Sequence, residues 1–307
     1  MLAWTASSGA YWLGVSAASG GAPASLAVSV NPANLAAGTY TENVNIAAAG
    51  AIGSPAQVSV TLVVTGTQPA ASITGVASAA SYQPGLASGT WISIFGSNLS
   101  ASTYTWQDSD FVSGQLPTFL QGVSVTINGV AAYVAYISPT QINLLAPDDA
   151  ATGAVQVQVT AAGQKSNTLS TPKTGLAPAF FTVVGGAYVA ALHADYSLVG
   201  APGLLPGVAT QPARPGETIL LYGTGFGPTT PPLPAGQLVT TPAPLPVLPQ
   251  IRIGGIAATV AFGGLVGPGL YQFNVTVPAN LPSGDAAVLA TLGGVTTQTG
   301  VSLTVLQ

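Results

Sequence analysis

The sequence predicts an all-β protein made of antiparallel β-sandwiches. Three observations support this class. Short segments alternate between apolar and uncharged polar residues, which is the period of a half-buried strand. Turn signals rich in Gly, Pro and Asn separate these segments. No long stretch has the periodicity and caps of a helix, and many short, regularly spaced strands are typical of sandwiches.

Five segments carry the alternation most clearly: residues 26–30, 58–62, 123–127, 155–159 and 273–277. In one of them, Val123, Val125 and Ile127 alternate with Ser124 and Thr126. We expect each strand to bury an aliphatic face and to expose an uncharged polar face. The turns between strands are expected at Gly38, Asn128-Gly129, Gly254-Gly255 and residues 282–284.

The charge content is low. Of 307 residues, 4% are charged, with Lys+Arg 4 against Asp+Glu 8 and a net charge of −4. Four basic residues cannot neutralise a phosphate backbone, so nucleic-acid binding is excluded. The lack of Cys excludes disulfides and thiolate metal sites. A surface of neutral polar groups does not repel a second copy or a neutral polymer, so charge does not oppose association.

The most apolar window, residues 176–192, contains Pro178 and a Gly-Gly pair. It predicts two strands and a turn, because a membrane-spanning helix needs about 20 predominantly apolar residues. We therefore expect no membrane span. The first basic residue after Met1 is Lys165, so the basic region of a signal peptide is missing. We expect a processed or partial chain, or a start other than Met1.

An internal repeat divides the chain. Residues 89–96 match 216–223, residues 127–129 match 253–255, and residues 141–147 match 272–278. Because order and spacing are kept, we expect two related sandwiches after a first unit of different pattern, which makes three units. The expected divisions are 1–66, a first repeat at 67–175, connecting strands at 176–211 and a second repeat at 212–307, with Thr67-Gln68-Pro69 as the first linker.

Three segments of the first unit carry a family resemblance: Trp12–Gly20, Gly38–Thr41 and Val58–Val64. They are similar to the Bacteroidetes-associated carbohydrate-binding often N-terminal domain. The resemblance implies an immunoglobulin-like sandwich. It also implies a strand before residues 2–5, which this sequence lacks.

Residues 76–307 carry a second resemblance through the segments Ala79–Tyr82, Ile94–Leu99, Tyr136–Asn143 and Tyr222–Gly227. They resemble the uncharacterised C-terminal domain family of secreted acidobacterial (Solibacter-type) proteins. The two halves are also similar to the immunoglobulin-like repeat of plexins and transcription factors. The resemblance implies secretion and immunoglobulin-like sandwiches, and it implies no catalysis.

No catalytic or cofactor-binding residues are predicted. The segment Gly223–Gly227 has the glycine spacing of a dinucleotide loop, but Pro228 follows where a helix would have to begin. We interpret it as a turn between strands. His193 and Asp195 lack the further ligands of a zinc site, and we interpret them as polar residues of a strand or hairpin.

The calcium candidates are Asp108, Asp110, Asp148 and Asp149, in two expected loops. Calcium takes about six to eight oxygen ligands, often from such loops. The spacing of these acids matches no EF-hand, and turn capping by Asp is the alternative interpretation. Asp148 and Asp149 are adjacent, whereas a glycosidase needs two facing carboxylates, so the sequence predicts no enzyme.

Trp106 is the predicted carbohydrate contact, because it lies in a loop between polar residues, where an exposed ring could stack on a sugar. Trp4 and Tyr11 are further large aromatic residues of this kind. Trp12 and Trp91 lie in strand patterns, which favours a place in the core.

Asn98 and Asn274 begin Asn-X-Ser/Thr triplets and are candidates for glycosylation. We expect Asn274 on the polar face of its strand.

The sequence favours a non-enzymatic extracellular structural or adhesive protein that associates with copies of itself. An incomplete first unit would leave a sheet edge unpaired, and a strand from a neighbouring copy would complete it and build a filament. A segment upstream in the same chain could instead fill the gap. The alternative function is a non-catalytic carbohydrate-binding module with a surface polysaccharide as partner. No cofactor is expected.

Overall fold

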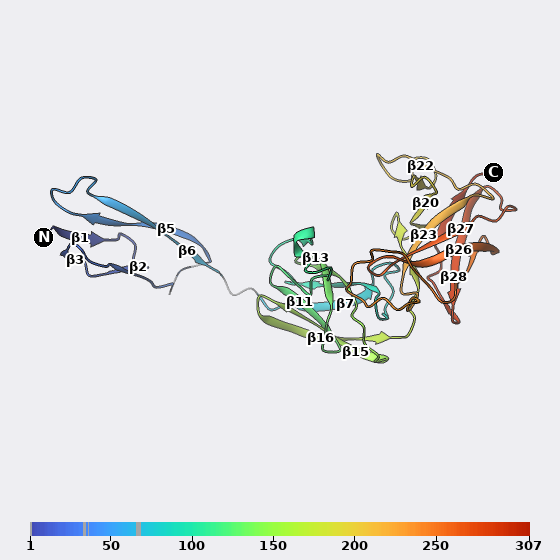
Figure 1. The fold of residues 1–307 in the computed structure, drawn as a ribbon, viewed down its shortest axis with the longest axis horizontal. Coiled ribbons are helices and arrows are strands. Elements are labelled where there is room, and N and C mark those ends of the chain that lie inside the picture. Colours follow the sequence, from blue (N-terminus) through green and yellow to red (C-terminus); the bar gives the residue numbers. More distant parts are fainter. Residues whose placement is uncertain (1, 33–34, 36, 66–68) are drawn as a thin grey trace. The chain divides into compact units, whose positions relative to one another are not determined.

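The computed structural model describes residues 2–32, 35, 37–65 and 69–307. The chain forms two compact units, Met1–Gln68 and Pro69–Gln307 (Figure 1). The regular elements of the described residues are strands, mostly antiparallel, and one 3-10 turn η1 (Asp108–Asp110), so the predicted all-β antiparallel fold is confirmed. In this part of the chain no helix has the length and apolar character needed to cross a membrane. Thr67 and Gln68 of the expected linker lie outside the described residues.

The first unit contains two sheets. The larger has the strand order β3-β1-β5-β6 and consists of β1 (Ala3–Ser7), β3 (Ser19–Gly21), β5 (Gly38–Ala47) and β6 (Ala56–Val64). The smaller pairs β2 (Leu13–Ser16) with β4 (Ala27–Val30). Trp12, Leu13 and Val44 form the buried core, and the ring of Tyr40 meets that of Trp12 edge-on at 6.3 Å between centroids.

The smaller sheet departs from the expected burial. All four residues of β4 are exposed, and the side chains of Val28 and Val30 are 43% and 47% exposed. The prediction that this strand buries its aliphatic face is therefore wrong. The reason is that β4 pairs with β2 alone, so no strand covers its other side within the described residues. In β6, Val60 and Leu62 pack on the core, as predicted.

The second unit begins with a sandwich of two five-stranded sheets. One has the order β7-β8-β14-β13-β9, with β7 (Ser72–Ser78), β8 (Trp91–Ser97), β9 (Tyr104–Thr105), β13 (Tyr133–Ile137) and β14 (Gln141–Leu145). The other contains β10 (Phe119–Leu120), β11 (Val123–Ile127), β12 (Val130–Ala131), β15 (Gly153–Ala161) and β16 (Gln164–Lys173). Val123, Val125 and Ile127 are buried in alternation, as predicted.

The rest of the second unit forms another sandwich, in which long β26 pairs with both β25 and β27 and so joins the two layers. Its strands up to residue 224 are β17 (Ala179–Phe180), β18 (Thr182–Val183), β19 (Tyr188–Val189), β20 (Ala191–His193), β21 (Leu198–Val199), β22 (Thr210–Gln211) and β23 (Thr218–Thr224). The later strands are β24 (Ala243–Pro244), β25 (Gln250–Ile253), β26 (Ile256–Gly267), β27 (Leu270–Thr276), β28 (Gly284–Leu292), β29 (Val295–Thr296) and β30 (Ser302–Val305). Its core includes Phe180, Phe226 and Phe273, with the last two rings 4.5 Å apart.

The repeated segments of the sequence occupy equivalent places. In the first sandwich, β14 pairs with β8 so that Gln141 lies opposite Phe95. In the second, β27 pairs with β23 so that Gln272 lies opposite Tyr222. Each Gln donates from Nε2 to Oδ1 of the Asn two residues later, at 2.8 Å in both sandwiches. The repeat is therefore a repeat of pairing register. The expected divisions at residues 175 and 211 stay predictions.

Two hairpins show why the repeat contains a Gly at its second turn residue. Asn128 and Gly129 have φ values of 52° and 79°, and Gly254 and Gly255 have values of 59° and 80°. Positive φ at both central residues defines the type I′ turn, which matches the twist of the flanking strands and favours Asn-Gly and Gly-Gly. Both predicted turns are thus hairpin turns, between β11 and β12 and between β25 and β26.

Candidate functional site

The two sandwiches of the second unit meet at a junction made by loops from both. Trp91 donates from its backbone N to Thr224 Oγ1 at 3.1 Å and from its indole Nε1 to the carbonyl of Pro268 at 2.9 Å. The N–H of Leu116 donates to the carbonyl of Gly236 at 2.7 Å. These bonds hold the loop between β23 and β24 against the first sandwich.

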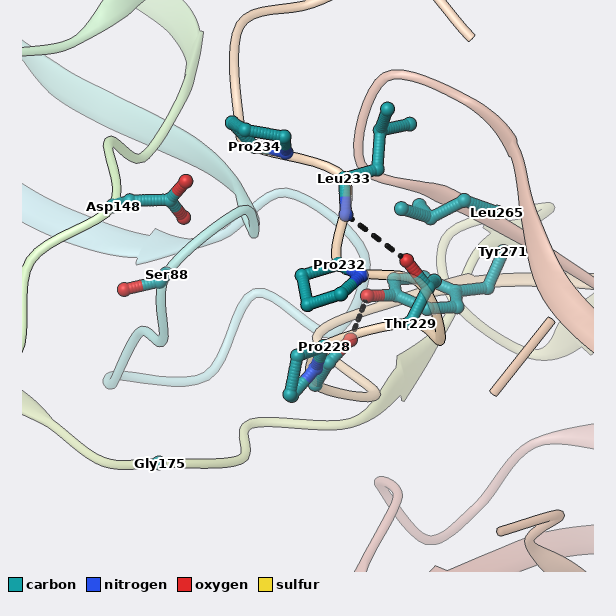
Figure 2. Close-up of a pocket in the computed structure, with 11 residues that line it drawn as sticks. Ser88, Asp148, Gly175, Pro228, Thr229, Pro232, Leu233, Pro234, Leu265 and Tyr271 are labelled. Atoms are coloured by element: carbon teal, nitrogen blue, oxygen red, sulfur yellow. Dashed lines mark hydrogen bonds between the residues drawn. The ribbon is translucent and has the colours of Figure 1, made fainter. Parts of the chain in front are cut away.

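A cavity of about 400 Å³ lies at this junction (Figure 2). Ser88 and Asp148 line it from loops of the first sandwich, and a proline-rich segment of the second sandwich faces them. The full lining is Ser88, Asp148, Gly175, Gly227, Pro228, Thr229, Pro232, Leu233, Pro234, Leu265 and Tyr271. The volume falls within the range of about 300–1,000 Å³ typical of small-molecule sites.

Asp148 is the charged residue of the cavity lining. It follows β14, is exposed, and accepts a hydrogen bond at 2.8 Å from the N–H of Ala235 through Oδ2. Within the described residues it takes part in no ion pair. Its carboxylate therefore keeps free acceptor sites, since an ionised carboxylate has about four lone-pair positions.

Tyr271 lies on the opposite wall and is almost fully buried. Its hydroxyl donates to the carbonyl of Gly227 (Figure 2). Burial raises the pKa of the Tyr271 phenol, and the negative charge of Asp148 raises it further. The hydroxyl thus stays protonated, and its donor is already used inside the protein.

The two aliphatic hydroxyls of the cavity are also engaged. Thr229 donates from Oγ1 to the carbonyl of Pro231 at 2.9 Å and accepts from the N–H of Leu233 at 3.2 Å. Ser88 donates to the backbone carbonyl of Asp149 at 3.2 Å and accepts from its N–H at 3.3 Å. Each hydroxyl keeps one free acceptor site, because a hydroxyl has one donor and two acceptor positions.

Asp149, the neighbour of Asp148, is held by the protein itself. Its carboxylate lies 3.5 Å from Nζ of Lys173, which is 2% exposed, and accepts from Asn128 Nδ2 at 3.1 Å and from the N–H of Ala151 at 3.0 Å. These hydrogen bonds, from Ala151 first and Asn128 second, together with the Lys173 charge, hold the pKa of Asp149 below its ordinary value. The structure thus separates the roles of the two adjacent acids.

The other pair of calcium candidates lies at η1. Asp110 Oδ2 accepts from the hydroxyl of Tyr104 at 3.0 Å and from the N–H of Gln107 at 2.7 Å, which is the predicted capping of a turn by Asp. Asp108 begins the same turn. Among the described residues, no group of three or more His, Cys, Asp or Glu side chains could hold a metal ion. Calcium at either pair stays a prediction.

Trp106 sits in a cluster of three rings. It meets Trp91 at 5.7 Å and Phe111 at 5.2 Å between centroids, edge-on in both cases, and is half-buried. Its neighbours therefore cover part of the ring that the sequence led us to expect in solvent. Contact of Trp106 with a carbohydrate stays a prediction.

The other four aromatic candidates have different surroundings. Trp12 is buried in the core of the first unit, as predicted, and Trp91 is half-buried at the junction rather than in a sheet interior. Trp4 is half-buried and lies across from Gly20 in the pairing of β1 with β3. Tyr11 is 76% exposed, so it is more accessible than Trp106.

His193 ends β20, in agreement with its interpretation as a polar strand residue. Its Nδ1 lies 3.2 Å from Glu217 Oε1, and its Nε2 lies 3.1 Å from the carbonyl of Gln211. Asp195 instead accepts from the N–H and hydroxyl of Ser197, at 3.0 Å and 2.6 Å. The two residues serve different hydrogen-bonding partners in one hairpin.

The glycosylation candidates lie in ordered backbone. Asn98 has a φ of 54° and precedes the fully buried Leu99, and the hydroxyl-bearing Ser100 is itself buried. Asn274 is half-buried on the polar side of β27, where it was expected. Modification at either stays a prediction.

The sequence analysis identified Asp148 but missed Ser88, Lys173 and Tyr271. Proline density could have marked the loop that walls the cavity, since residues 228–234 contain four prolines. Nothing in the sequence pairs this loop with residues 88 and 148, because the three segments meet only through the packing of one sandwich on the other.

Residues 77–174 match the family model of the IPT/TIG domain, an immunoglobulin-like fold. This match agrees with the plexin and transcription-factor resemblance of the first repeat. The expected resemblances to the Bacteroidetes-associated domain and to the Solibacter-type family stay predictions. No curated protein matches the sequence.

Three solved structures illustrate the likeness to known folds. A mixed-linkage glucan utilization locus SGBP-B from Bacteroides ovatus, in complex with a mixed-linkage heptasaccharide, is 11% identical, with a TM-score of 0.34, covering 99% of this chain and 60% of that one. The surface glycan-binding protein PbSGBP-B from Prevotella bryantii is 13% identical, with a TM-score of 0.22 and coverages of 76% and 40%. The plexin A4 extracellular region is 10% identical, with a TM-score of 0.26 and coverages of 99% and 30%. The chain thus spans less than two thirds of each of these proteins.

Proposed function

We propose that this protein is a non-enzymatic extracellular structural or adhesive protein, and that its first unit associates with a second copy by β-strand addition. Repeated in one direction, such a contact would build a filament. The observation that carries the proposal is the open edge of β4, where Val28 and Val30 are largely exposed.

The backbone of β4 is oriented for strand addition. The N–H of Asn31 donates to the carbonyl of Trp12, and hydrogen-bonded pairs alternate along an antiparallel ladder. Val30 opposite Leu13 and Val28 opposite Val15 are therefore the pairs that do not bond across the ladder. Their peptide groups face away from β2, so an added strand would find both donors and acceptors there.

Charge does not protect this edge. Natural sheets blunt open edges with Lys, Pro or inward-facing charges. The strands β4 and β6 contain no charged residue and no Pro, and Glu42 is the one charged side chain in residues 1–68. A second copy of the same unit would thus meet almost no repulsion.

A pair of matched substitutions tests the proposal. Val28→Lys places a charge at the open edge and should weaken self-association about tenfold or more, because the ammonium must be desolvated for a strand to pair there. Val208→Lys is the control, since Val208 in the second unit is equally exposed at 44%. Sedimentation velocity and electron microscopy of the full chain measure assembly, and circular dichroism checks the fold. Dispersed monomers for the unmodified chain, or equal effects of the two variants, would contradict the proposal.

A third variant distinguishes strand addition from face-to-face docking. Val28→Pro removes an N–H that faces away from β2 and leaves the β2–β4 ladder bonds in place. Strand addition at this edge should then be lost. Undiminished assembly of the Val28→Pro chain would show that copies meet through another surface.

Carbohydrate binding at Trp106 is the alternative function. It predicts that Trp106→Ala weakens pull-down of the chain on an insoluble polysaccharide and leaves assembly unchanged, which is the reverse of the outcome for Val28→Lys.

A further inference from the structure

We propose that the cavity at the junction of the second unit binds a neutral, hydroxyl-rich ligand, a short oligosaccharide. Asp148 and Ser88 would contact it from one sandwich and the proline-rich segment after β23 from the other (Figure 2). The proposal is independent of self-association, which involves the first unit.

The unused hydrogen-bonding capacity of the cavity consists of acceptors. The hydroxyls of Tyr271, Thr229 and Ser88 each donate inside the protein. What remains free is one acceptor site on Thr229, one on Ser88, one on the carbonyl of Gly227 and several on the carboxylate of Asp148. A ligand must therefore donate hydrogen bonds, which excludes phosphate and carboxylate ligands.

The distribution of these acceptors favours several hydroxyls over one cation. Asp148 is the charged group of the lining and is exposed, so a single ammonium would gain little from pairing with it. The remaining acceptors are neutral and lie on separate residues. A polyol can reach several of them at once, whereas an ammonium group presents its donors at one point.

The walls complete the match to a sugar. Pro228, Pro232, Pro234 and Leu265 present apolar C–H surfaces around the polar groups. A pyranose ring likewise combines apolar C–H faces with a hydroxyl rim. The cavity of about 400 Å³ has room for a short oligosaccharide rather than for a long chain.

The cavity is preformed, because hydrogen bonds join its two sides. Ala235 donates to Asp148, and Leu116 donates to Gly236 in the loop that walls the cavity. Trp91 donates to Pro268 beside it. A ligand would thus meet fixed acceptors and lose little affinity to ordering the protein.

The test is a titration of the full chain, followed by ¹⁵N NMR. The probes are cellotetraose, laminaritetraose, xylotetraose and mannotetraose, with n-butylammonium and inorganic phosphate as the cationic and anionic comparisons. We expect at least one tetrasaccharide to shift the amide signals of Ala235 and Leu233 with a Kd of about 1 mM or lower. Butylammonium and phosphate should leave these signals unchanged.

Asp148→Asn should weaken this binding about tenfold, because it removes the charge while its amide oxygen can still accept from Ala235. Asp108→Asn makes the same chemical change at η1 and should leave the affinity unchanged. Trp106→Ala should also leave it unchanged. Binding lost with Trp106→Ala and kept with Asp148→Asn would overturn the proposal, as would binding of butylammonium alone or no shift with any tetrasaccharide at about 10 mM.

Discussion

At the scale of residues, the scarcity of charge gives each ionised group a definite structural task. Lys173 is buried at the end of β16, and its ammonium contacts both the carboxylate and the backbone carbonyl of Asp149. A buried ammonium without such partners would carry a large desolvation penalty. Asp149 therefore fixes the loop after β14, and this loop also places Asp148 at the cavity.

Acidification should weaken the contribution of Asp149. Because hydrogen bonds and Lys173 lower its pKa in the folded state, Asp149 stabilises the fold above its unfolded-state pKa, and this stabilisation is lost as the pH falls through about 4 and below. We expect Asp149→Asn to be less stable than the unmodified chain at pH 6, and the difference to shrink towards pH 3. Urea unfolding over this range measures it.

Asp108→Asn is the control for removing one negative charge elsewhere in the same sandwich. A difference between Asp149→Asn and the unmodified chain that stays constant from pH 6 to pH 3 would contradict this account of Asp149.

At the scale of elements, the junction depends on close approach of a loop to a strand. Gly236 lies in the loop between β23 and β24 with a φ of 86°, and a Cβ at this position would overlap the ring of Tyr133 on β13. Only glycine adopts this conformation without strain and leaves room for the ring. The loop can therefore lie flat on the first sandwich and close one side of the cavity.

Gly236→Ala should lower the free energy of unfolding by about 2–4 kcal/mol, since it combines backbone strain with overlap against Tyr133. Gly114→Ala is the matched control. Gly114 has a φ of 75° and open space around its added Cβ, so it should lose only about 1 kcal/mol. Chemical denaturation measures both, and equal losses would show that Tyr133 yields without cost.

At the scale of the whole molecule, the two units have unequal cores. The buried core of the first unit is Trp12, Leu13 and Val44, whereas the second unit has two extensive clusters, one in each sandwich. Small domains bury a smaller fraction of their surface and are correspondingly less stable. The first unit also leaves aliphatic side chains in solvent that a partner strand would cover.

Calorimetry of the full chain should therefore show two transitions, with the first unit unfolding at the lower temperature. The lower transition should rise with protein concentration, because association through the first unit stabilises its folded state by mass action. The upper transition should coincide with that of residues 69–307 alone. A single transition for both units would show that they unfold as one.

The extent to which the sequence anticipated the fold follows from the range of the signals. Alternation and turn residues act over a few positions, so strands such as Val123–Ile127 and turns such as Asn128-Gly129 could be predicted directly. Burial of β4 was mispredicted because alternation shows only that a strand has an apolar face. Whether a neighbour covers that face depends on strand pairing, which the alternation of β4 does not contain.

The sequence by itself determined the all-β class, the repeated pairing unit and a surface nearly without charge, because these properties reside in local periodicity and composition. Only the tertiary structure decided which residues meet. It bound Asp149 to Lys173, turned Asp148 towards a proline-walled cavity, half-covered Trp106 and left β4 open, since each of these outcomes depends on contacts between segments far apart in the chain.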